Sequence, residues 1–227
     1  MRSPLAVKLV LFDLDGTVVD SAPDLAHAAN LMLQELGRTE QPANRIAAWI
    51  GDGMIRLVKR ALTGEINGEP DPALFARGLA SFKAHYAAHL AVRTQPYPGV
   101  VDVLEQLSLQ GFVLGCVTNK LETFTRALLE QLDLARYFRV VVAGDTVPAR
   151  KPDPLPLRHA CEQVRGRAER AVLVGDSAND VLAARAAGMH CIAVTYGYSQ
   201  GRDLRALQPD RVVDSAPEVL QHLRLHD

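Results

Sequence analysis

Residues 7–17 read VKLVLFDLDGT. The run Val7–Phe12 is rich in β-branched and aliphatic residues, and it stops at Asp13 and Asp15, just before the turn-forming Gly16. A short apolar run bounded by polar and turn residues is typical of a parallel strand that is buried on both faces. We therefore predict that the central sheet of an α/β protein begins here, with two carboxylates at the carboxyl end of its first strand.

Runs of the same kind recur along the chain. The predicted further strands are Phe112–Val117, Val140–Ala143, Ala171–Val174, Cys191–Val194 and a short edge strand, Arg211–Val213. Helical patterns separate most of them, at Val100–Leu109, Leu121–Leu132, Pro154–Val164 and Ala178–Ala187, and a last helix is predicted over Ala216–Leu225. This alternation indicates an α/β fold with a doubly wound, Rossmann-like parallel sheet.

A long helical insert separates the first two strands. The intervening segment, on the order of 100 residues, is far too long for one crossover connection. Helical patterns occur at Leu25–Leu36, Asn44–Ile50, Met54–Leu62 and from Asp71 to about Ala91, with Ser21 as a candidate N-cap of the first. Arg93–Gly99 contains two prolines and is predicted to be the returning linker. We predict a catalytic core of residues 1–19 and 94–227 and a helical cap of residues 20–93.

Composition excludes several classes of protein. The 227 residues carry 25 basic and 26 acidic side chains, so no general attraction to nucleic acid is expected. No window approaches the ~18 apolar residues of a membrane span, and the first residues do not resemble a secretory signal. The three cysteines fit neither a disulfide framework nor a zinc site. We expect a cytoplasmic monomer or homodimer with no nucleic-acid or membrane partner.

Polar side chains follow the predicted strands where these end. Thr118 and Asn119 follow the second strand, Lys151 comes after the third, and Asp176 and Asp180 follow the fourth. Ligands of open α/β sheets bind beyond the carboxyl ends of the strands, so we expect these side chains to meet the aspartates of the first strand.

The expected cluster has the chemistry of a metal site that handles an anion. Carboxylates at close range repel unless a cation lies among them, and an all-oxygen set of Asp13, Asp15 and Asp176 selects a hard ion, for which Mg²⁺ is the first choice. Thr118 can donate to phosphate oxygens, and Lys151 adds a positive charge. Asp180 can orient Lys151, or it can merely cap the following helix.

These motifs resemble those of the haloacid dehalogenase superfamily. Asp13-Leu-Asp15-Gly-Thr17, Thr118-Asn119, Lys151-Pro and Gly-Asp176-Ser-Ala-Asn-Asp180 occur in the family's order, and the resemblance covers essentially the whole chain. It implies that Asp13 is a nucleophile that forms an aspartyl-phosphate and that Asp15 is the general acid and base. It further implies that Mg²⁺ is held by Asp13, the backbone carbonyl of Asp15 and Asp176, and that the insert is a small mobile cap of the C1 type.

The insert and the tail carry a narrower likeness. Ser21-Ala-Pro-Asp-Leu, Trp49-Ile-Gly-Asp-Gly53, Pro96-Tyr-Pro-Gly-Val100 and Tyr196-Gly-Tyr resemble bacterial phosphoglycolate phosphatases, which implies hydrolysis of 2-phosphoglycolate to glycolate. Gly53 at a helix start, with Arg56 one turn on, is a candidate site for the substrate carboxylate. An ordinary turn with a solvated arginine fits equally well. Asp52 stands where these phosphatases often have asparagine, and it would need a base such as Arg56 beside it.

Several alternatives stay open at this stage. The chain could act on another small phosphorylated metabolite, such as a sugar phosphate, or be a phosphomutase that passes the phosphoryl group to a second hydroxyl. A phosphate-accepting receiver module also has acidic strand ends, but it has about half this length and no cap. His85 and His89 could share a metal on one helical face, although no third ligand is evident. Trp49 and Tyr86 are predicted to pack within the cap.

Overall fold

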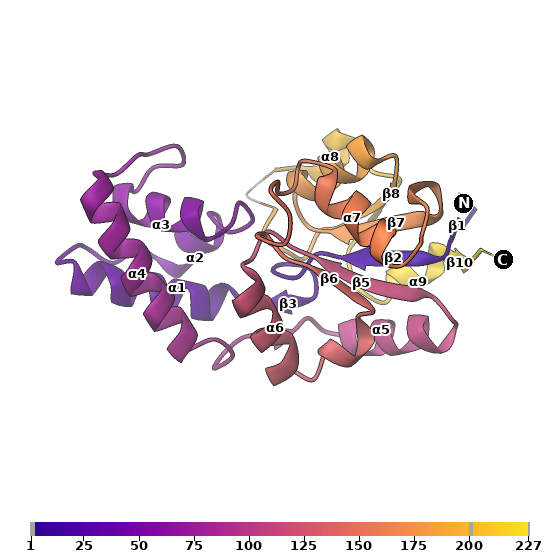
Figure 1. Ribbon diagram of the computed structural model, residues 1–227, viewed down its shortest axis with the longest axis horizontal. Coiled ribbons are helices and arrows are strands. Elements are labelled where there is room, and N and C mark those ends of the chain that lie inside the picture. Colours follow the sequence, from indigo (N-terminus) through magenta and orange to yellow (C-terminus); the bar gives the residue numbers. More distant parts are fainter. Residues whose placement is uncertain (1–2, 200–201, 227) are drawn as a thin grey trace.

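A computed structural model describes residues 3–199 and 202–226. Its centre is a six-stranded sheet in which every neighbouring pair is parallel (Figure 1). In spatial order the strands are β6 (Val140–Val142), β5 (Val113–Val117), β2 (Leu9–Phe12), β7 (Ala171–Gly175), β8 (His190–Val194) and β9 (Arg211–Val213). The predicted parallel α/β sheet is confirmed.

The strand order creates a crevice beside β2. The chain runs from β2 to β5 and β6 on one side, and then crosses back to β7, β8 and β9 on the other side. The connections therefore diverge between β2 and β7, and such a switch point leaves a crevice beyond the carboxyl ends of the strands. Asp13 and Asp176, the residues that follow β2 and β7, stand at that crevice.

Helices cover both faces of the sheet. Successive strand residues point to opposite faces, so Val10 and Phe12 pack in one core cluster, while Leu9 and Leu11 pack in another. In Figure 1 one face carries α5 (Val100–Leu109), α6 (Glu122–Gln131) and α9 (Glu218–Gln221), and the other carries α7 (Leu155–Gln163) and α8 (Ala178–Ala187). The sheet is doubly wound. Single 3₁₀ turns occur at η1 (Ala135–Tyr137), η2 (Ala168–Arg170) and η4 (Leu204–Leu207).

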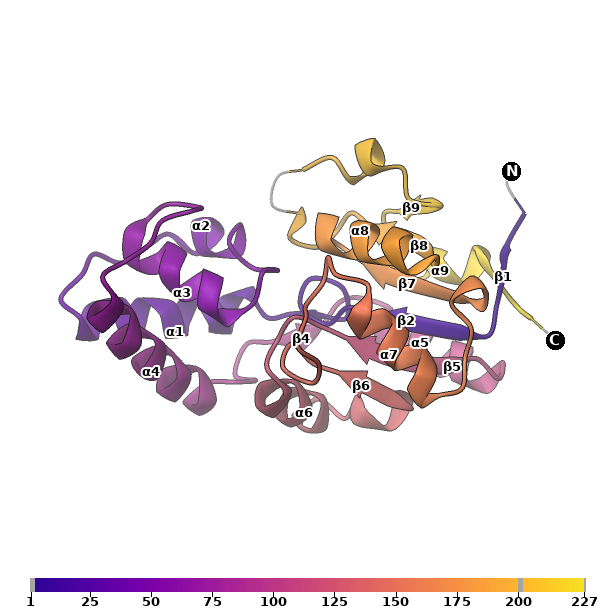
Figure 2. The same ribbon diagram turned by 45° about the horizontal axis from the view of Figure 1, so that its top comes forward.

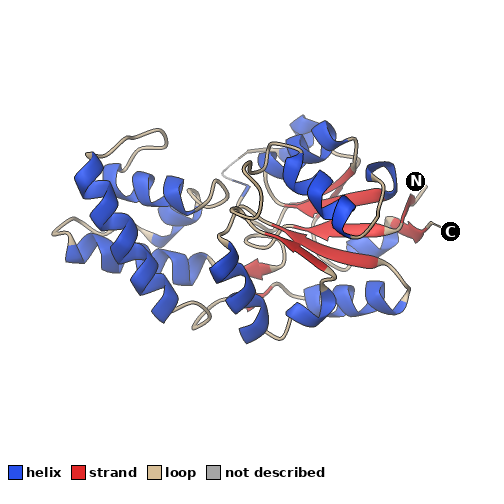
Figure 3. Cartoon of the chain, in the orientation of Figure 1, coloured by secondary structure: helices blue, strands red, loops and turns tan. Residues whose placement is uncertain are grey.

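The insert forms four helices that lie together beside the carboxyl ends of the strands (Figures 2 and 3). They are α1 (Ala22–Glu35), α2 (Ala43–Ala47), α3 (Met54–Thr63) and α4 (Pro72–Ala88). Asp71 is the N-cap of α4, and its Oδ1 accepts hydrogen bonds from the backbone N–H groups of Ala73 and Leu74, both at 3.0 Å. The helices share a core in which Phe82 and Tyr86 are fully buried. We refer to this helical unit as the cap, and its boundaries with the core stay a prediction.

The two linkers of the cap are joined to each other. Val19 and Asp20 form β3, which pairs antiparallel with β4 (Gln95–Pro96). Just beyond it, the buried carboxylate of Asp24 accepts from the backbone N–H of Arg93 at 2.9 Å, from the N–H of Thr94 at 2.8 Å and from the Thr94 hydroxyl at 2.7 Å. The start of α1 and the returning linker are thus tied together at the base of the cap.

Replacing Asp24 by alanine is expected to lower the free energy of unfolding by about 2–4 kcal/mol, because buried donors on the returning linker lose a charged acceptor. Denaturant unfolding monitored by circular dichroism would measure the change. Asp102→Ala is the matched control, since Asp102 is an exposed aspartate in the first turn of α5, where a change within about 0.5 kcal/mol is expected. Equal losses in the two variants would contradict the structural role of Asp24.

Two predicted boundaries are wrong, both where the ends of the chain meet. The predicted helix Ala216–Leu225 is reduced to the short α9, and Leu223–Leu225 forms β10, which pairs parallel with β1 (Leu5–Val7). The predicted single strand Val7–Phe12 is divided at Lys8, whose N–H donates to the carbonyl of Arg170 at 2.8 Å. Backbone hydrogen bonds offered by distant segments override the local pattern in both places. In the described part of the chain, no helix is long and apolar enough to span a bilayer.

Candidate active site

Three buried carboxylates converge at the crevice. Asp13 and Asp176, 7% and 2% exposed, follow the adjacent strands β2 and β7, and the N–H of Asp13 donates to the carbonyl of Val174 at 2.9 Å. One oxygen each of Asp13, Asp176 and Asp180 lies within 4.8 Å of the others. The adjacency of β2 and β7 thus brings Asp13 beside Asp176 and Asp180, which come much later in the sequence.

A lysine fixes the carboxylate of Asp13. Asp13 Oδ1 accepts from the N–H of Leu14 at 2.7 Å, and Lys151 Nζ lies 2.9 Å from the same oxygen. Burial raises the pKa of Asp13 to about 7, and the charge of Lys151 opposes that rise. Burial alone would lower the pKa of Lys151, but the carboxylates of Asp13 and Asp180 raise it above its usual value, so this lysine keeps its charge.

Asp176 lies in a narrow cradle. Its Oδ2 accepts from the N–H of Tyr198 at 2.7 Å, and its Oδ1 accepts from the hydroxyl of Thr17 at 3.3 Å. A β-carbon added at Gly16 or Gly197 would clash with the Asp176 carboxylate, so only glycine fits beside it. Burial, followed by the nearby Asp13, raises the pKa of Asp176 well above its usual value.

This donor set fits a hard divalent cation. The pKa values of Asp13 and Asp176 are raised, because ionising two neighbouring buried carboxylates costs free energy. A nearby positive charge would lower that cost. The donor atoms of these carboxylates are oxygens, which suit Mg²⁺ and Ca²⁺ rather than a softer metal. The burial, the closeness of the oxygens and the glycine cradle are features of a cluster that could hold a divalent metal ion.

Asp180 fills both roles that its sequence position left open. Its Oδ2 accepts from the N–H of Ser177 at 3.0 Å and from the Ser177 hydroxyl at 2.5 Å, which caps α8. Its Oδ1 accepts from Lys151 Nζ at 2.6 Å. Asp180 therefore caps α8 with one oxygen and holds Lys151 with the other.

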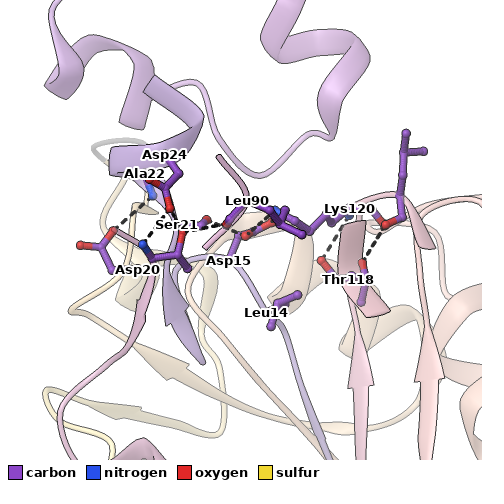
Figure 4. Close-up of polar contacts among 12 residues, drawn as sticks. Leu14, Asp15, Asp20, Ser21, Ala22, Asp24, Leu90, Thr118 and Lys120 are labelled. Atoms are coloured by element: carbon purple, nitrogen blue, oxygen red, sulfur yellow. Dashed lines mark hydrogen bonds and ion pairs between the residues drawn. The ribbon is translucent and has the colours of Figure 1, made fainter. Parts of the chain in front are cut away.

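The side chain of Asp15 lies outside the acidic cluster and pairs with a second lysine (Figure 4). Lys120 Nζ lies 2.9 Å and 3.1 Å from the two carboxylate oxygens of Asp15, and the hydroxyl of Ser21 donates to Oδ1 at 2.5 Å. Ser21 is the N-cap residue of α1, as predicted, but its side chain makes no capping hydrogen bond with a helix N–H. Instead, the tyrosine hydroxyl of Tyr198 accepts from the N–H groups of Ser21 and Ala22 at 2.7 Å and 2.8 Å.

Thr118 and Asn119 follow β5 beside these groups. Thr118 is held by a hydrogen bond from its N–H to the carbonyl of Val142 at 2.9 Å, and its hydroxyl accepts from the N–H of Lys120 at 3.2 Å. Asn119 Nδ2 donates to the carbonyls of Gly51 and Lys151, both at 3.0 Å, so this side chain joins the cap loop to the core.

A small pocket, with a cavity volume of about 40 Å³, lies between the cap and the carboxyl ends of the strands. The predicted residues Asp13, Asp15, Gly53, Thr118 and Asn119 line it. The remaining lining is largely apolar, apart from Gly51, Lys120 and the phenol of Tyr86, and consists of Leu25, Ile50, Met54, Leu57 and Leu121. Polar groups at one end and an apolar wall supplied by the cap are typical of a small-ligand site.

The structure does not bring Arg56 to this pocket. Its side chain is 48% exposed and pairs with Glu69 at 3.1 Å, on the outside of the cap. The expected base beside Asp52 is Arg60 instead, with Arg60 Nη2 2.6 Å from Asp52 Oδ2, and Asn179 of the core donates to Asp52 Oδ1 at 2.8 Å. One helical turn separates the two arginines, and only the buried one, Arg60, faces the loop.

The paired histidines of α4 have separate partners. His85 Nε2 lies 3.0 Å from Glu35 Oε2, while His89 Nδ1 is 2.8 Å from the carbonyl of His85. Neither belongs to the acidic cluster described above.

Sequence reasoning assigned no role to Lys120 and treated Tyr86 as packing. Tyr86 does pack, against Phe82 and Phe124, but it also lines the pocket. Lys120 directly follows the Thr118-Asn119 pair, so its position at a strand end was the available signal. For Tyr86 the sequence carried no such signal, because which face of α4 meets the core depends on how the cap docks.

Comparison with known proteins extends these observations. A family model described as haloacid dehalogenase-like hydrolase matches residues 10–194. A phosphoglycolate phosphatase of Thiobacillus denitrificans is 50% identical over 216 residues, which are 95% of this chain and 95% of that protein. One of Nitrosospira multiformis is 50% identical over 219 residues, 96% of each. A crystal structure described as a predicted phosphoglycolate phosphatase from Haemophilus somnus aligns with a TM-score of 0.89 at 32% identity, over 95% of this chain and 97% of that one.

Proposed function

The chain belongs to the haloacid dehalogenase-like hydrolase family and is a phosphatase, and from that premise we propose that it hydrolyses 2-phosphoglycolate to glycolate and phosphate through an aspartyl-phosphate, with Mg²⁺ as cofactor. The observation that carries the proposal is the buried triangle of Asp13, Asp176 and Lys151-bound Asp180 beneath a small capped pocket. The names and the full-length similarity of the relatives support the choice of substrate.

We propose Asp13 and Asp176 as side-chain ligands of Mg²⁺, together with the backbone carbonyl of Asp15. The bound ion would offset the charge of the buried carboxylates and of the phosphoryl oxygens. The fit rests on the oxygen donors, the raised pKa values of Asp13 and Asp176, and the glycine cradle beside Asp176.

In the first step a carboxylate oxygen of Asp13 attacks phosphorus, and the bond from phosphorus to the glycolate oxygen breaks. Two donors, Leu14 N–H and Lys151 Nζ, hold Asp13 Oδ1 and so set the rotation of the carboxylate before attack. Asp15 gives its proton to the departing glycolate oxygen. Thr118, Asn119 and Lys151 are proposed to bind the phosphoryl oxygens, where their donors stabilise the charge of the transition state.

In the second step a water oxygen attacks phosphorus, and the bond to Asp13 breaks, which regenerates the carboxylate. Asp15, now ionised, takes the proton of that water. Lys151, held by Asp180, keeps its positive charge next to the transferring group throughout. We propose that residues 20–93 act as the cap that excludes bulk water during the first step, with Gly53 at the pocket wall.

A panel of phosphate monoesters tests the proposed function directly. We expect phosphoglycolate to show the highest kcat/KM and steady release of phosphate with Mg²⁺, and chelator to abolish that release until Mg²⁺ is restored. Phosphate should appear without a bisphosphate activator, which separates hydrolysis from a phosphomutase, and at a sustained rate, which a receiver module would not show. A higher kcat/KM for a sugar phosphate would show that phosphoglycolate is not the preferred substrate. Full activity in the presence of chelator would show that no metal ion is needed.

A further inference from the structure

The pocket contains one cationic side chain among the described residues that line it, Lys120. Lys120 is 7% exposed and lies next to Asp15, with Nζ 4.8 Å from the centre of the Tyr86 ring. A buried lysine side chain, paired with Asp15, is therefore present inside the pocket.

The pocket also holds polar atoms that lack a well-formed hydrogen bond in the described chain, although Tyr86 lies next to the ammonium of Lys120. The hydroxyl of Tyr86, a residue with 0% exposure, has no hydrogen-bond partner, and the same is true of Asn119 Oδ1. Burial raises the pKa of Tyr86 to about 12, so the hydroxyl remains a donor at neutral pH. Buried polar atoms are rarely left unpaired in folded proteins, so the hydroxyl of Tyr86, which can donate, points to a polar ligand in the pocket.

Lys120 lies beside Asp15, the residue proposed to protonate the leaving group. Lys120 contacts Asp15, and Asp15 must contact the ester oxygen that it protonates. Whatever the leaving group carries next to that oxygen lies within reach of Lys120 and Tyr86. An ammonium offers three N–H donors, more than the single carboxylate of Asp15 requires, so a second anion can share it.

We propose that Lys120 and Tyr86 form the subsite for an anionic substituent of the leaving group, and that they select a short 2-hydroxy acid ester over an uncharged alcohol ester. This inference rests on the proposed function, because it names the residues that recognise the substrate carboxylate in it. It assigns to Lys120, from the core, and Tyr86, from α4, the recognition that sequence analysis had assigned to Arg56. Since one partner is on the cap and the other on the core, a bound carboxylate would also join the two.

The test compares 2-phosphoglycolate with ethyl phosphate, which has the same number of carbons and no carboxylate. The readout is the kcat/KM for phosphoglycolate divided by the kcat/KM for ethyl phosphate. Any general effect on Asp15 or on the fold changes both values and cancels in this ratio. In Lys120→Met we expect this ratio to fall about 10- to 100-fold, as for loss of a charge-assisted hydrogen bond. Lys120→Arg should recover part of the preference. Tyr86→Phe, which keeps the ring and the packing, should lower the ratio about 5- to 10-fold, mainly through a higher KM for phosphoglycolate.

Lys83→Met is the matched control, because it removes a positive charge from an exposed position on α4, the helix that carries Tyr86. Its ratio should equal that of the wild type. An unchanged ratio in Lys120→Met and Tyr86→Phe would overturn the inference, and a selective loss in Arg56→Ala would assign the recognition to that residue instead. Failure of the proposed function looks different, since the wild type itself would then show no preference for phosphoglycolate.

Discussion

Replacing Asp13 by asparagine is expected to abolish turnover, with a loss of at least about 10⁴-fold in kcat. The amide has nearly the size of the carboxylate, but it is a poor nucleophile and a poor ligand for a hard cation. Asp13 also pairs with Lys151 and belongs to the cluster of buried carboxylates, and in the proposed mechanism it accepts the phosphoryl group, so we expect no neighbouring group to replace it. Phosphate release from phosphoglycolate with saturating Mg²⁺ would measure the loss.

The fold should survive this substitution. The change removes the carboxylate of Asp13, which lies beside the buried carboxylate of Asp176, and both groups have raised pKa values. It therefore removes the repulsion between these two carboxylates. We expect the far-ultraviolet circular dichroism and the thermal midpoint to stay close to those of the wild type. Asp102→Asn, the same replacement at an exposed position of α5, should keep full activity. Retained turnover in folded Asp13→Asn protein would remove Asp13 as the nucleophile.

Replacing Asp15 by asparagine is expected to lower kcat by about 10²–10⁴-fold, the usual size of a general acid–base contribution. The amide can neither protonate glycolate nor take a proton from water, so both steps slow down. Where the second step is slowed more, the aspartyl-phosphate accumulates. Rapid-quench measurement of glycolate and phosphate would then show a burst of glycolate without matching phosphate, and intact-mass analysis would show one added phosphoryl group.

This variant also separates catalysis from recognition. Asparagine leaves the ammonium of Lys120 without its carboxylate partner but does not remove it from the pocket. The subsite for the substrate carboxylate therefore stays in place, and we expect KM for phosphoglycolate to stay near its wild-type value or fall while kcat drops. A loss below about tenfold in kcat would reject Asp15 as the acid and base.

Much of the fold was predictable because its signals are local. The sheet was predicted from short apolar runs ending in Asp, Gly or Thr, which need no knowledge of distant residues to be recognised as buried strands. The errors fell where partners come from far along the chain. Leu223–Leu225 has a helical pattern, but it forms a strand because the backbone of Leu5–Val7 lies beside it.

By itself, the sequence determined which chemical groups stand at the ends of the strands, since the alternation of strands and helices sends the carboxyl ends of parallel strands to one edge. The order β6-β5-β2-β7-β8-β9, which the tertiary structure supplies, decided that Asp13 and Asp176 are neighbours. Docking of the cap decided that Lys120, paired with Asp15, shares a pocket with Tyr86. Packing within the cap decided that Arg60 rather than Arg56 meets Asp52. Spacing along a helix cannot choose between such partners, because the choice depends on which face the rest of the chain buries.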